Sequence, residues 1–336
     1  MLIDDDFFMS LAIDEAWKYQ GLTYPNPAVG CTIVGENKEL LAIEAHKCAG
    51  MPHAEVLALQ SAYFKLTNDA KILDLVDSSE IHNYLLLHHN NCFKNISLYS
   101  TLEPCSHIGK TPSCASLICS LGIKEVFVGV RDANIVASDG ASMMLENKVD
   151  VKYTTLQKRA KDLILPFERF NKDQFVFFKW AQRLNATTDT GVISSQSSRQ
   201  KVHAMRDVCD LLIIGGNTVR EDRPTLDARL VDGKAPDVLI LSRGVEFDRE
   251  IPLFSVPSRE VYIEDSLKRI KNYKNIMIEG SFNMFELTKD IVDIYLCFLA
   301  PTMGGVSGFE DAKAGFEILY TNQEDKDIML WMKREI

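Results

Sequence analysis

A set of four residues in three separate segments constrains this chain more than any other part of its sequence: His53, Glu55, Cys105 and Cys114. Residues 53–55 read His-Ala-Glu, and Pro104-Cys105 and then Cys114 follow later in the chain. A catalytic zinc ion takes three protein ligands from His and Cys and keeps the fourth tetrahedral position for water. His53, Cys105 and Cys114 supply such a set. The chain must therefore fold so that these distant segments meet.

Glu55 lies two residues after the first ligand, close enough to exchange protons with zinc-bound water without binding the metal itself. We therefore expect Glu55 to be the general acid/base of a hydrolytic deamination. A helix is expected to begin near His53, because the apolar residues 56–59 follow it. Cys114 comes two residues after Pro112, a residue type that opens helices. It should lie in a first helical turn, where the helix dipole favours a thiolate.

The same residues also fit purely structural roles. His-x-Glu occurs on solvated helices, and two cysteines can be buried core thiols. A closed structural zinc site would need a fourth ligand, for which Cys31, Cys48 or His107 could serve. The occurrence of all three parts in order, with a proline before the first cysteine, favours the catalytic interpretation.

Length and charge restrict the class of protein. With 336 residues, 46% of them apolar, the chain is long enough for about two domains. Its net charge of −10, without a basic stripe, counts against nucleic acid as a partner and favours a small substrate. The eight cysteines form no paired framework and the N-terminus is acidic, so we expect a reduced, cytoplasmic protein. No apolar run has the length needed to cross a membrane.

The first part of the chain alternates between helix and strand patterns. Asp6 is a candidate N-cap for an amphipathic helix that includes Phe7 to Ala16. Helices are expected at 112–121 and 141–146, and strands at 28–34, 96–99, 124–130 and 149–153. This order predicts an α/β domain over residues 1–150.

Residues 65–95 separate the two halves of the zinc motif and are polar. We interpret them as a surface insert, because loops tolerate insertion. The pair His88-His89 could form a second metal site, although a solvated loop is the favoured interpretation.

The second part of the chain also alternates. A linker helix region is expected over 151–173, followed by a domain over 174–336 with a helix at 198–208. Strands are expected at 174–180, 211–214, 238–241, 261–263, 276–278, 291–299 and 328–331. Apolar strands alternating with helices predict a mostly parallel sheet, with ligands at the carboxyl ends of its strands.

Two glycine turns of this domain could approach a phosphate. Residues 215–218 read Gly-Gly-Asn-Thr where a strand gives way to a helix, and Gly304-Gly305 form the second turn. Residues 220–229 are dense in charge and contain three arginines, whose forks suit phosphate. Ordinary tight turns at the glycines, and a solvated loop with several ion pairs at residues 220–229, would give the same sequence pattern. The residues alone predict a domain that binds a phosphorylated ligand.

Three segments together carry a family resemblance. Residues 26–30 (Asn-Pro-Ala-Val-Gly), 53–55 and 101–114 (Thr-Leu-Glu-Pro-Cys-Ser-His-Ile-Gly-Lys-Thr-Pro-Ser-Cys) resemble the bifunctional deaminase/reductase of riboflavin biosynthesis. The eight residues between Cys105 and Cys114 differ from the Cys-x-x-Cys of cytidine and tRNA deaminases. The resemblance extends over nearly the whole chain.

For the first domain, the resemblance implies a cytidine-deaminase-like α/β/α fold. Such a domain removes the exocyclic amine of 2,5-diamino-6-ribosylamino-4(3H)-pyrimidinone 5′-phosphate. Zinc would be bound by His53, Cys105 and Cys114, and Glu55 would move the protons. The positions that match the family's substrate contacts are Asn26, His107 and Lys110.

For the second domain, the resemblance implies a dihydrofolate-reductase-like α/β/α fold that uses NADPH to reduce the ribosyl group to a ribityl chain. The positions matching cofactor contacts are Thr218, Asp222 and Ser242, together with the late turn Gly304-Gly305. The positions matching substrate contacts are Leu226, Arg229 and Glu279. The resemblance also implies a homo-oligomer, a dimer or larger.

The chain departs from the family pattern at residues 183–186. The family usually has Ser-Leu-Asp-Gly there, whereas this chain has Arg-Leu-Asn-Ala. This difference motivates an alternative in which the first domain is a deaminase and the second is a non-catalytic module for ligand binding or dimerisation. A third hypothesis makes the zinc structural and the chain an interaction protein.

Overall fold

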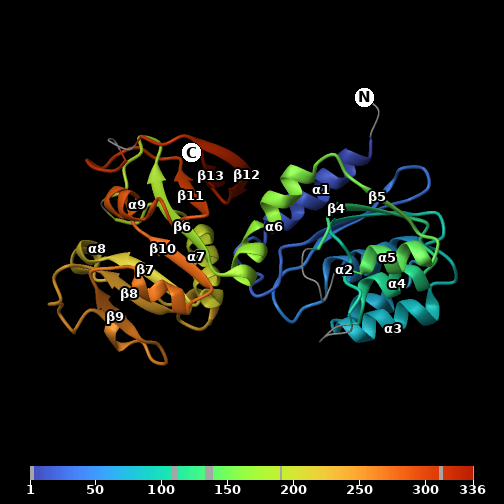
Figure 1. Ribbon diagram of the computed structural model, residues 1–336, viewed down its shortest axis with the longest axis horizontal. Helices are drawn as coiled ribbons and strands as arrows, with labels where there is room; N and C mark the ends of the chain where they lie inside the picture. Colours follow the sequence, from blue (N-terminus) through green and yellow to red (C-terminus); the bar gives the residue numbers. More distant parts are fainter. Residues whose placement is uncertain (1–3, 108–111, 133–138, 190, 310–312, 336) are drawn as a thin grey trace. The chain divides into compact units, whose positions relative to one another are not determined.

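The computed structural model divides the chain into two compact units, residues 1–168 and 169–336 (Figure 1). It describes residues 4–107, 112–132, 139–189, 191–309 and 313–335. The division falls within helix α6 (Gln157–Lys172). Among the described helices, none combines the length and the hydropathy that crossing a bilayer requires.

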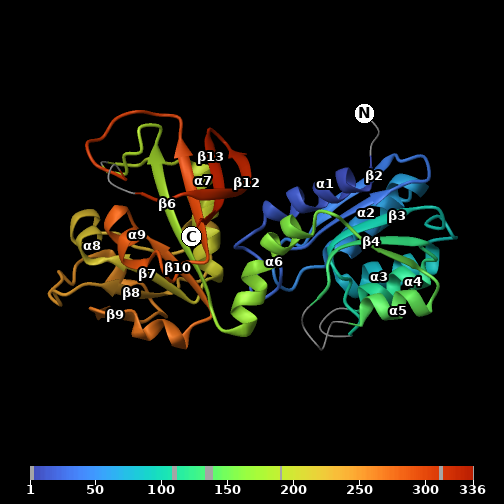
Figure 2. The same cartoon turned by 45° about the horizontal axis from the view of Figure 1, so that its top comes forward.

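The N-terminal unit is built on a five-stranded sheet with the order β2-β1-β3-β4-β5. Strand β1 is antiparallel to β2 and β3, whereas β3, β4 and β5 are parallel. Helices α1 and the first part of α6 lie on one face, and α2, α4 and α5 lie on the other (Figures 1 and 2). The strands are β1 (Gly30–Val34), β2 (Leu40–Ala45), β3 (Ser97–Leu102), β4 (Glu125–Val130) and β5 (Asp150–Tyr153). The helices are α1 (Asp5–Trp17), α2 (Ala54–Thr67), α3 (Ser78–His88), α4 (Cys114–Ser120) and α5 (Gly140–Glu146), with a 3-10 turn at Ala70–Asp74.

The predicted N-cap of the first helix is wrong. Asp4 caps α1, because its side chain accepts a hydrogen bond from the amide of Phe7 at 3.0 Å. Asp6 lies inside the first turn, and its carboxylate accepts bonds from the hydroxyls of Thr154 and Thr155 instead. Several acidic residues stand in succession here, so the sequence did not distinguish a capping aspartate from one that bonds a distant loop.

The insert over residues 65–95 is more ordered than a loop. It contains the end of α2, the 3-10 turn and α3. The Gln60 amide of α2 donates to the carbonyls of Ile72 and Leu75, at 2.7 and 2.9 Å. The Tyr84 hydroxyl donates to Asp69 at 2.6 Å. The Gln60 bonds attach the insert to α2, the helix that follows the first zinc ligand, and the Tyr84–Asp69 bond joins α3 to the start of the insert's 3-10 turn. Among the described residues, the group that could hold a metal consists of His53, Cys105 and Cys114, and it includes neither His88 nor His89. His88 is the last residue of α3.

The C-terminal unit contains an eight-stranded sheet with the order β12-β13-β11-β6-β10-β7-β8-β9. The six strands from β11 to β9 are parallel, and β13 and β12 continue the sheet antiparallel. The mostly parallel sheet predicted from the sequence is therefore present. Its strands are β6 (Phe175–Arg183), β7 (Leu211–Gly215), β8 (Asp237–Leu241), β9 (Val261–Glu264), β10 (Asn275–Glu279), β11 (Ile294–Ala300), β12 (Phe316–Glu324) and β13 (Asp327–Arg334). The helices are α7 (Gln196–Val208), α8 (Gly216–Asp222) and α9 (Phe282–Thr288), with 3-10 turns at Arg229–Val231, Pro252–Ser255 and Lys268–Asn272.

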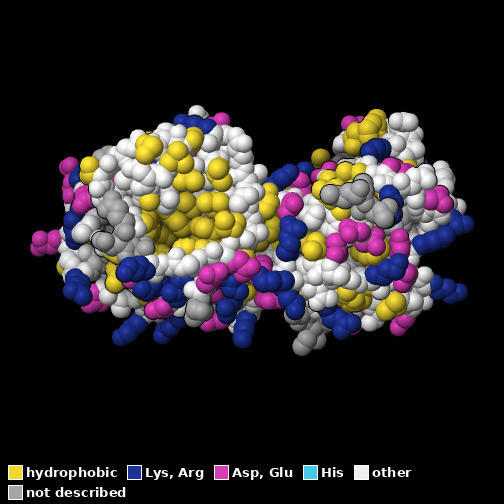
Figure 3. All heavy atoms as spheres, turned by 90° about the horizontal axis from the view of Figure 1, so that it is seen from above, with side chains coloured by type: hydrophobic (Ala, Val, Ile, Leu, Met, Phe, Trp, Pro, Cys, Tyr) yellow, Lys and Arg dark blue, Asp and Glu magenta, His cyan; other side chains and the backbone are white. Residues whose placement is uncertain are grey.

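Parallel pairing places the candidate site residues of this unit at one edge of the sheet. Strands β7, β8 and β10 end at Gly215, Leu241 and Glu279, and Lys179 of β6 is in register with Glu279. Hydrophobic side chains gather in a hollow on one face of this unit (Figure 3). The carboxyl ends of parallel strands are where ligands bind in such folds.

Candidate active sites

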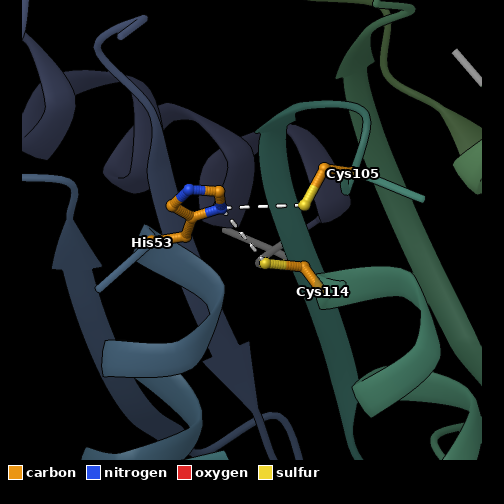
Figure 4. A group of neighbouring side chains, drawn as sticks. All are labelled: His53, Cys105 and Cys114. Atoms are coloured by element: carbon orange, nitrogen blue, oxygen red, sulfur yellow. Dashed lines mark hydrogen bonds between the residues drawn. The ribbon is translucent and has the colours of Figure 1, made fainter. Parts of the chain in front are cut away.

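The three predicted zinc ligands meet in the N-terminal unit (Figure 4). His53 is the N-cap of α2, Cys105 follows β3, and Cys114 is the first residue of α4. The Nδ1 atom of His53 lies 3.7 Å from Cys105 Sγ and 3.4 Å from Cys114 Sγ. Tetrahedral zinc with bonds of about 2.0 Å to nitrogen and about 2.3 Å to sulfur places the two ligand atoms about 3.5 Å apart. The donor set and its spacing therefore fit zinc.

The ligand count is that of a catalytic site. Within the part of the chain that the structure describes, the ligand atoms lying within 4.8 Å of one another come from these three residues. Cys31, Cys48 and His107, the candidates for a fourth ligand, are not in the group. Three ligands of this kind leave one tetrahedral position for water, as in catalytic zinc sites.

The electrostatics of the cluster favour a thiolate. A hydrogen bond from the Cys114 thiol, assisted by one from His53, lowers the pKa of Cys105 to about 4 against the opposing effect of burial. The same bond and burial raise the pKa of Cys114 well above its ordinary value. Glu55 is buried, and burial raises the pKa of its carboxyl group, which interacts electrostatically with His53 and Cys105. Glu55 therefore lies beside the zinc cluster without belonging to the ligand group.

The loop that carries Cys105 is fixed from two sides. The buried carboxylate of Glu103 accepts bonds from the amides of Ala141 and Asp132, at 2.8 and 3.3 Å. A Cβ atom on Gly140 would lie 1.8 Å from the carbonyl oxygen that precedes Cys105, so only glycine lets the start of α5 approach this loop. These supports were not predicted from the sequence, although Glu103 stands next to the Pro-Cys pair.

Of the three candidate substrate residues of this unit, Asn26 is the one that the structure connects to the zinc cluster. The amide nitrogen of Asn26 lies 3.0 Å from Nε2 of His46, whose Nδ1 is 3.1 Å from the carbonyl of Pro52. The rings of His46 and His53 contact edge to face, 5.7 Å between centroids. Asn26 is thus connected to the zinc cluster through His46, a buried residue that was not predicted from the sequence. His107 is exposed in the loop after Cys105, and Lys110 lies outside the described residues.

A second cluster, of largely buried side chains, lies at the carboxyl edge of the other sheet. Arg206 of α7 donates two hydrogen bonds to Glu279, at 2.7 and 3.0 Å, and Lys179 Nζ lies 3.7 Å from the same carboxylate. Burial would raise the pKa of Glu279, but Arg206 and then Lys179 outweigh it and lower the pKa to about 2. Glu279 was predicted, whereas Arg206 and Lys179 were missed. The three side chains form a pair of cations around one anion.

The remaining predicted substrate residues lie beside this cluster. Arg206 also bonds the carbonyl of Asp227 at 3.3 Å, and the Asp227 carboxylate accepts a bond from Arg229 at 2.5 Å. Leu226 is buried with a left-handed backbone, φ 56°, and its carbonyl accepts a bond from Arg259 at 2.6 Å. The structure thus brings Leu226, Arg229 and Glu279 to one region.

The candidate cofactor residues separate into two groups. Thr218 and Asp222 lie on α8, and Ser242 follows β8, so these three share one part of the sheet edge. Gly304-Gly305 lie in the loop after β11, which β6 and β10 separate from β7. There the Asn185 and Thr187 side chains bond the carbonyl of Gly304, so the segment that departs from the family pattern packs on the diglycine turn.

Comparison with known proteins identifies the family. Residues 2–130 match the family described as Cytidine and deoxycytidylate deaminase zinc-binding region, and residues 181–314 match the RibD C-terminal domain. The Riboflavin biosynthesis protein RibD of Aquifex aeolicus is 30% identical, over 93% of this chain and 84% of that protein. The chain belongs to the RibD family. Its C-terminal match to a reductase domain argues against the hypothesis of a deaminase with a non-catalytic second domain.

Two solved structures share the fold of this chain along nearly its full length. The chain is 26% identical to a Thermotoga maritima diaminohydroxyphosphoribosylaminopyrimidine deaminase/5-amino-6-(5-phosphoribosylamino)uracil reductase, with a TM-score of 0.65 and 98% of each chain covered. An Acinetobacter baumannii RibD shares the fold at 23% identity, with a TM-score of 0.64 and 99% of each chain covered. The predicted fold class is confirmed as an α/β cytidine-deaminase-like domain followed by a second α/β domain, the C-terminal domain of the RibD family. The protein is an enzyme of riboflavin biosynthesis with a zinc-dependent deaminase domain and a reductase domain.

Proposed function

We propose that the N-terminal unit deaminates 2,5-diamino-6-ribosylamino-4(3H)-pyrimidinone 5′-phosphate and that the C-terminal unit then reduces the ribosyl group of the product to ribityl. The observation that carries the first half is the convergence of His53, Cys105 and Cys114, with their ligand atoms within 4.8 Å of one another and the buried Glu55 beside them. The second half is supported by the charged cluster around Glu279 at the carboxyl edge of a parallel sheet.

In the deaminase, the roles follow from position. Zinc, when bound, lowers the pKa of its water and so supplies the nucleophile. Glu55 takes a proton from this water and transfers it to the departing amine, so that water and the aminopyrimidine become the oxo product and ammonia. His46 donates from Nδ1 to the Pro52 carbonyl, so its Nε2 accepts from the Asn26 amide and leaves the Asn26 oxygen to face the substrate. His107 and Lys110 are proposed as further substrate contacts by family resemblance.

In the reductase, NADPH supplies the hydride. The sugar carbon that accepts it must lose its bond to the ring oxygen, and that oxygen must gain a proton. Lys179 is the proposed donor, since burial lowers the pKa of its ammonium group. Glu279 pairs with Lys179, and Arg206 in turn holds Glu279 by two hydrogen bonds. Leu226 and Arg229 are proposed to contact the substrate, with Arg229 suited to its phosphate.

The remaining assignments are also proposals. We place the cofactor against Thr218, Asp222 and Ser242 and the late turn Gly304-Gly305, and we assign residues 151–173 as the linker between catalytic domains. A cytoplasmic location is supported by the eight cysteines, all of them free thiols. Family resemblance supports a dimer or larger homo-oligomer, which light scattering of the purified enzyme would measure.

One experiment tests both halves. The purified full chain is given the diaminopyrimidine phosphate and NADPH, and ammonia and NADPH are followed together. We expect one NADPH to be oxidised for each ammonia released, with ammonia appearing first. Ammonia without NADPH oxidation would contradict the reductase half, and NADPH oxidation without ammonia would contradict the order of steps.

A further inference from the structure

Arg220 of α8 is a surface cation that its neighbours hold in one position. Its Nη2 lies 3.3 Å from Ser242 Oγ and 3.1 Å from the carbonyl of Gly244. Its guanidinium carbon stands 4.1 Å from the centre of the Phe247 ring. An exposed arginine normally samples many rotamers, and a ligand must then meet the entropic cost of ordering it. Here hydrogen bonds and ring stacking have already ordered the guanidinium.

The backbone beneath this cation is bare. A Cβ atom on Gly216 would lie 2.6 Å from Ser242 Oγ and 3.0 Å from Arg220 Nη1. Any side chain at Gly216 would therefore displace Ser242, and Nη1 lies over Gly216. Three groups from two segments converge here: a guanidinium, a hydroxyl and a glycine backbone.

The order of strands places this site at one end of a line of functional groups. Lys179 and Glu279 are on β6 and β10, Thr218 follows β7, and Ser242 follows β8. The strands β6, β10, β7 and β8 are successive neighbours, so β6 and β8 are about 14 Å apart at about 4.8 Å per step. If the nicotinamide lies at Lys179 and Glu279, where hydride must reach the sugar, an extended dinucleotide passes Thr218 and brings its adenosine to Ser242.

We propose that Arg220, with Ser242, binds the 2′-phosphate on the adenosine of NADPH and thereby selects NADPH over NADH. The inference rests on the proposed reductase function and adds the residue that discriminates between cofactors. The two dinucleotides differ only in this phosphate. An arginine fork can bond two phosphate oxygens at once, and a serine hydroxyl can donate a further bond. Arg220 Nη2 bonds Ser242 and Gly244, which leaves the hydrogens of Nη1 and Nε to bond the phosphate.

The test is equilibrium binding to the full chain without substrate. Dissociation constants for NADPH, NADH, 2′,5′-ADP and 5′-AMP are measured by calorimetry for the wild type and for Arg220→Ala. Arg249→Ala is the matched control, because Arg249 is also exposed and stacked on a ring, 4.6 Å from the centre of Phe254. We expect Arg220→Ala to weaken NADPH and 2′,5′-ADP by about tenfold to a hundredfold, the size of a lost charge-assisted bond. NADH and 5′-AMP should bind as before, and Arg249→Ala should alter none of the four.

Further outcomes separate this inference from the function on which it rests. Equal weakening of NADPH and NADH in Arg220→Ala would overturn the inference, because Arg220 would then support the dinucleotide in general. An unchanged preference for NADPH in that variant would also overturn it. If the wild type bound neither dinucleotide, the proposed reductase function itself would fail. A wild type that binds NADPH, together with an insensitive Arg220→Ala, would reject only the role of Arg220.

Discussion

Replacing Glu279 with glutamine should destabilise the C-terminal unit by an amount that depends on pH. Glu279 is largely buried between Arg206 and Lys179, whose charges hold its pKa at about 2 instead of 4.5. A depression of this size corresponds to about 3 kcal/mol of folding free energy at neutral pH. The variant also leaves two buried cations without their anion, and breaking a buried pair costs about 3 to 5 kcal/mol.

The pH dependence has a definite sign. The pKa of Glu279 is lower in the folded chain, so its contribution is complete above pH 4.5 and is lost as the pH falls toward 2. At pH 4, the contribution of Glu279 to the free energy of unfolding should already be smaller by about 1 kcal/mol. The gap in unfolding free energy between wild type and Glu279→Gln should therefore be smaller at pH 4 than at pH 7.

Hydrogen exchange across a urea series, read by mass spectrometry, would report each unit separately. In Glu279→Gln, peptides from β6 and β10 should show a lower free energy of unfolding than in the wild type. Peptides from β3 and β4 should show no change. Glu286→Gln is the control: its pair with Lys289 is partly exposed, so it should cost less than about 1 kcal/mol. A loss no larger than the control's, or an equal gap at both pH values, would refute the reasoning.

Three further variants test the sites. Glu55→Gln should lower ammonia release by about 10²- to 10⁴-fold while metal analysis finds zinc retained; an unchanged rate would remove Glu55 from the mechanism. His46→Ala frees the Asn26 amide, so steady-state kinetics should show weaker deamination with zinc content unaltered, and loss of zinc would instead make His46 a support of the metal site. Arg229→Ala should raise the KM of the reductase for its phosphorylated substrate by about tenfold and leave ammonia release intact; an unaltered KM would place the phosphate elsewhere.

The sequence predicted the zinc site well because the chemistry restricts its residue types. Zinc accepts few ligands, and the proline before Cys105 and the helix beginning at Cys114 are local signals. The supports of the site gave no such signal. Glu103 and His46 act through partners that become neighbours only when the chain folds, and nothing in the local sequence names those partners.

The second site was predicted less completely for the same reason. Glu279 ends an apolar strand at a glycine, which is visible in the sequence, whereas Arg206 comes from a helix and Lys179 from a neighbouring strand. Strands β2 and β12 were also missed. Strand β12 contains no buried residue, and β2 (Leu-Leu-Ala-Ile-Glu-Ala) is built mainly from residues that favour helices, so their place in the sheets depends on partners elsewhere in the chain.

The central claim is that His53, Cys105 and Cys114 bind one zinc ion with a fourth position open to water. X-ray absorption at the zinc edge of the purified enzyme tests it most directly. We predict one zinc per chain, with two sulfur ligands at about 2.3 Å and two lighter ligands, one imidazole nitrogen and one water oxygen, at about 2.0 Å. A shell with three or four sulfur ligands, or a protein that binds no zinc, would contradict the account.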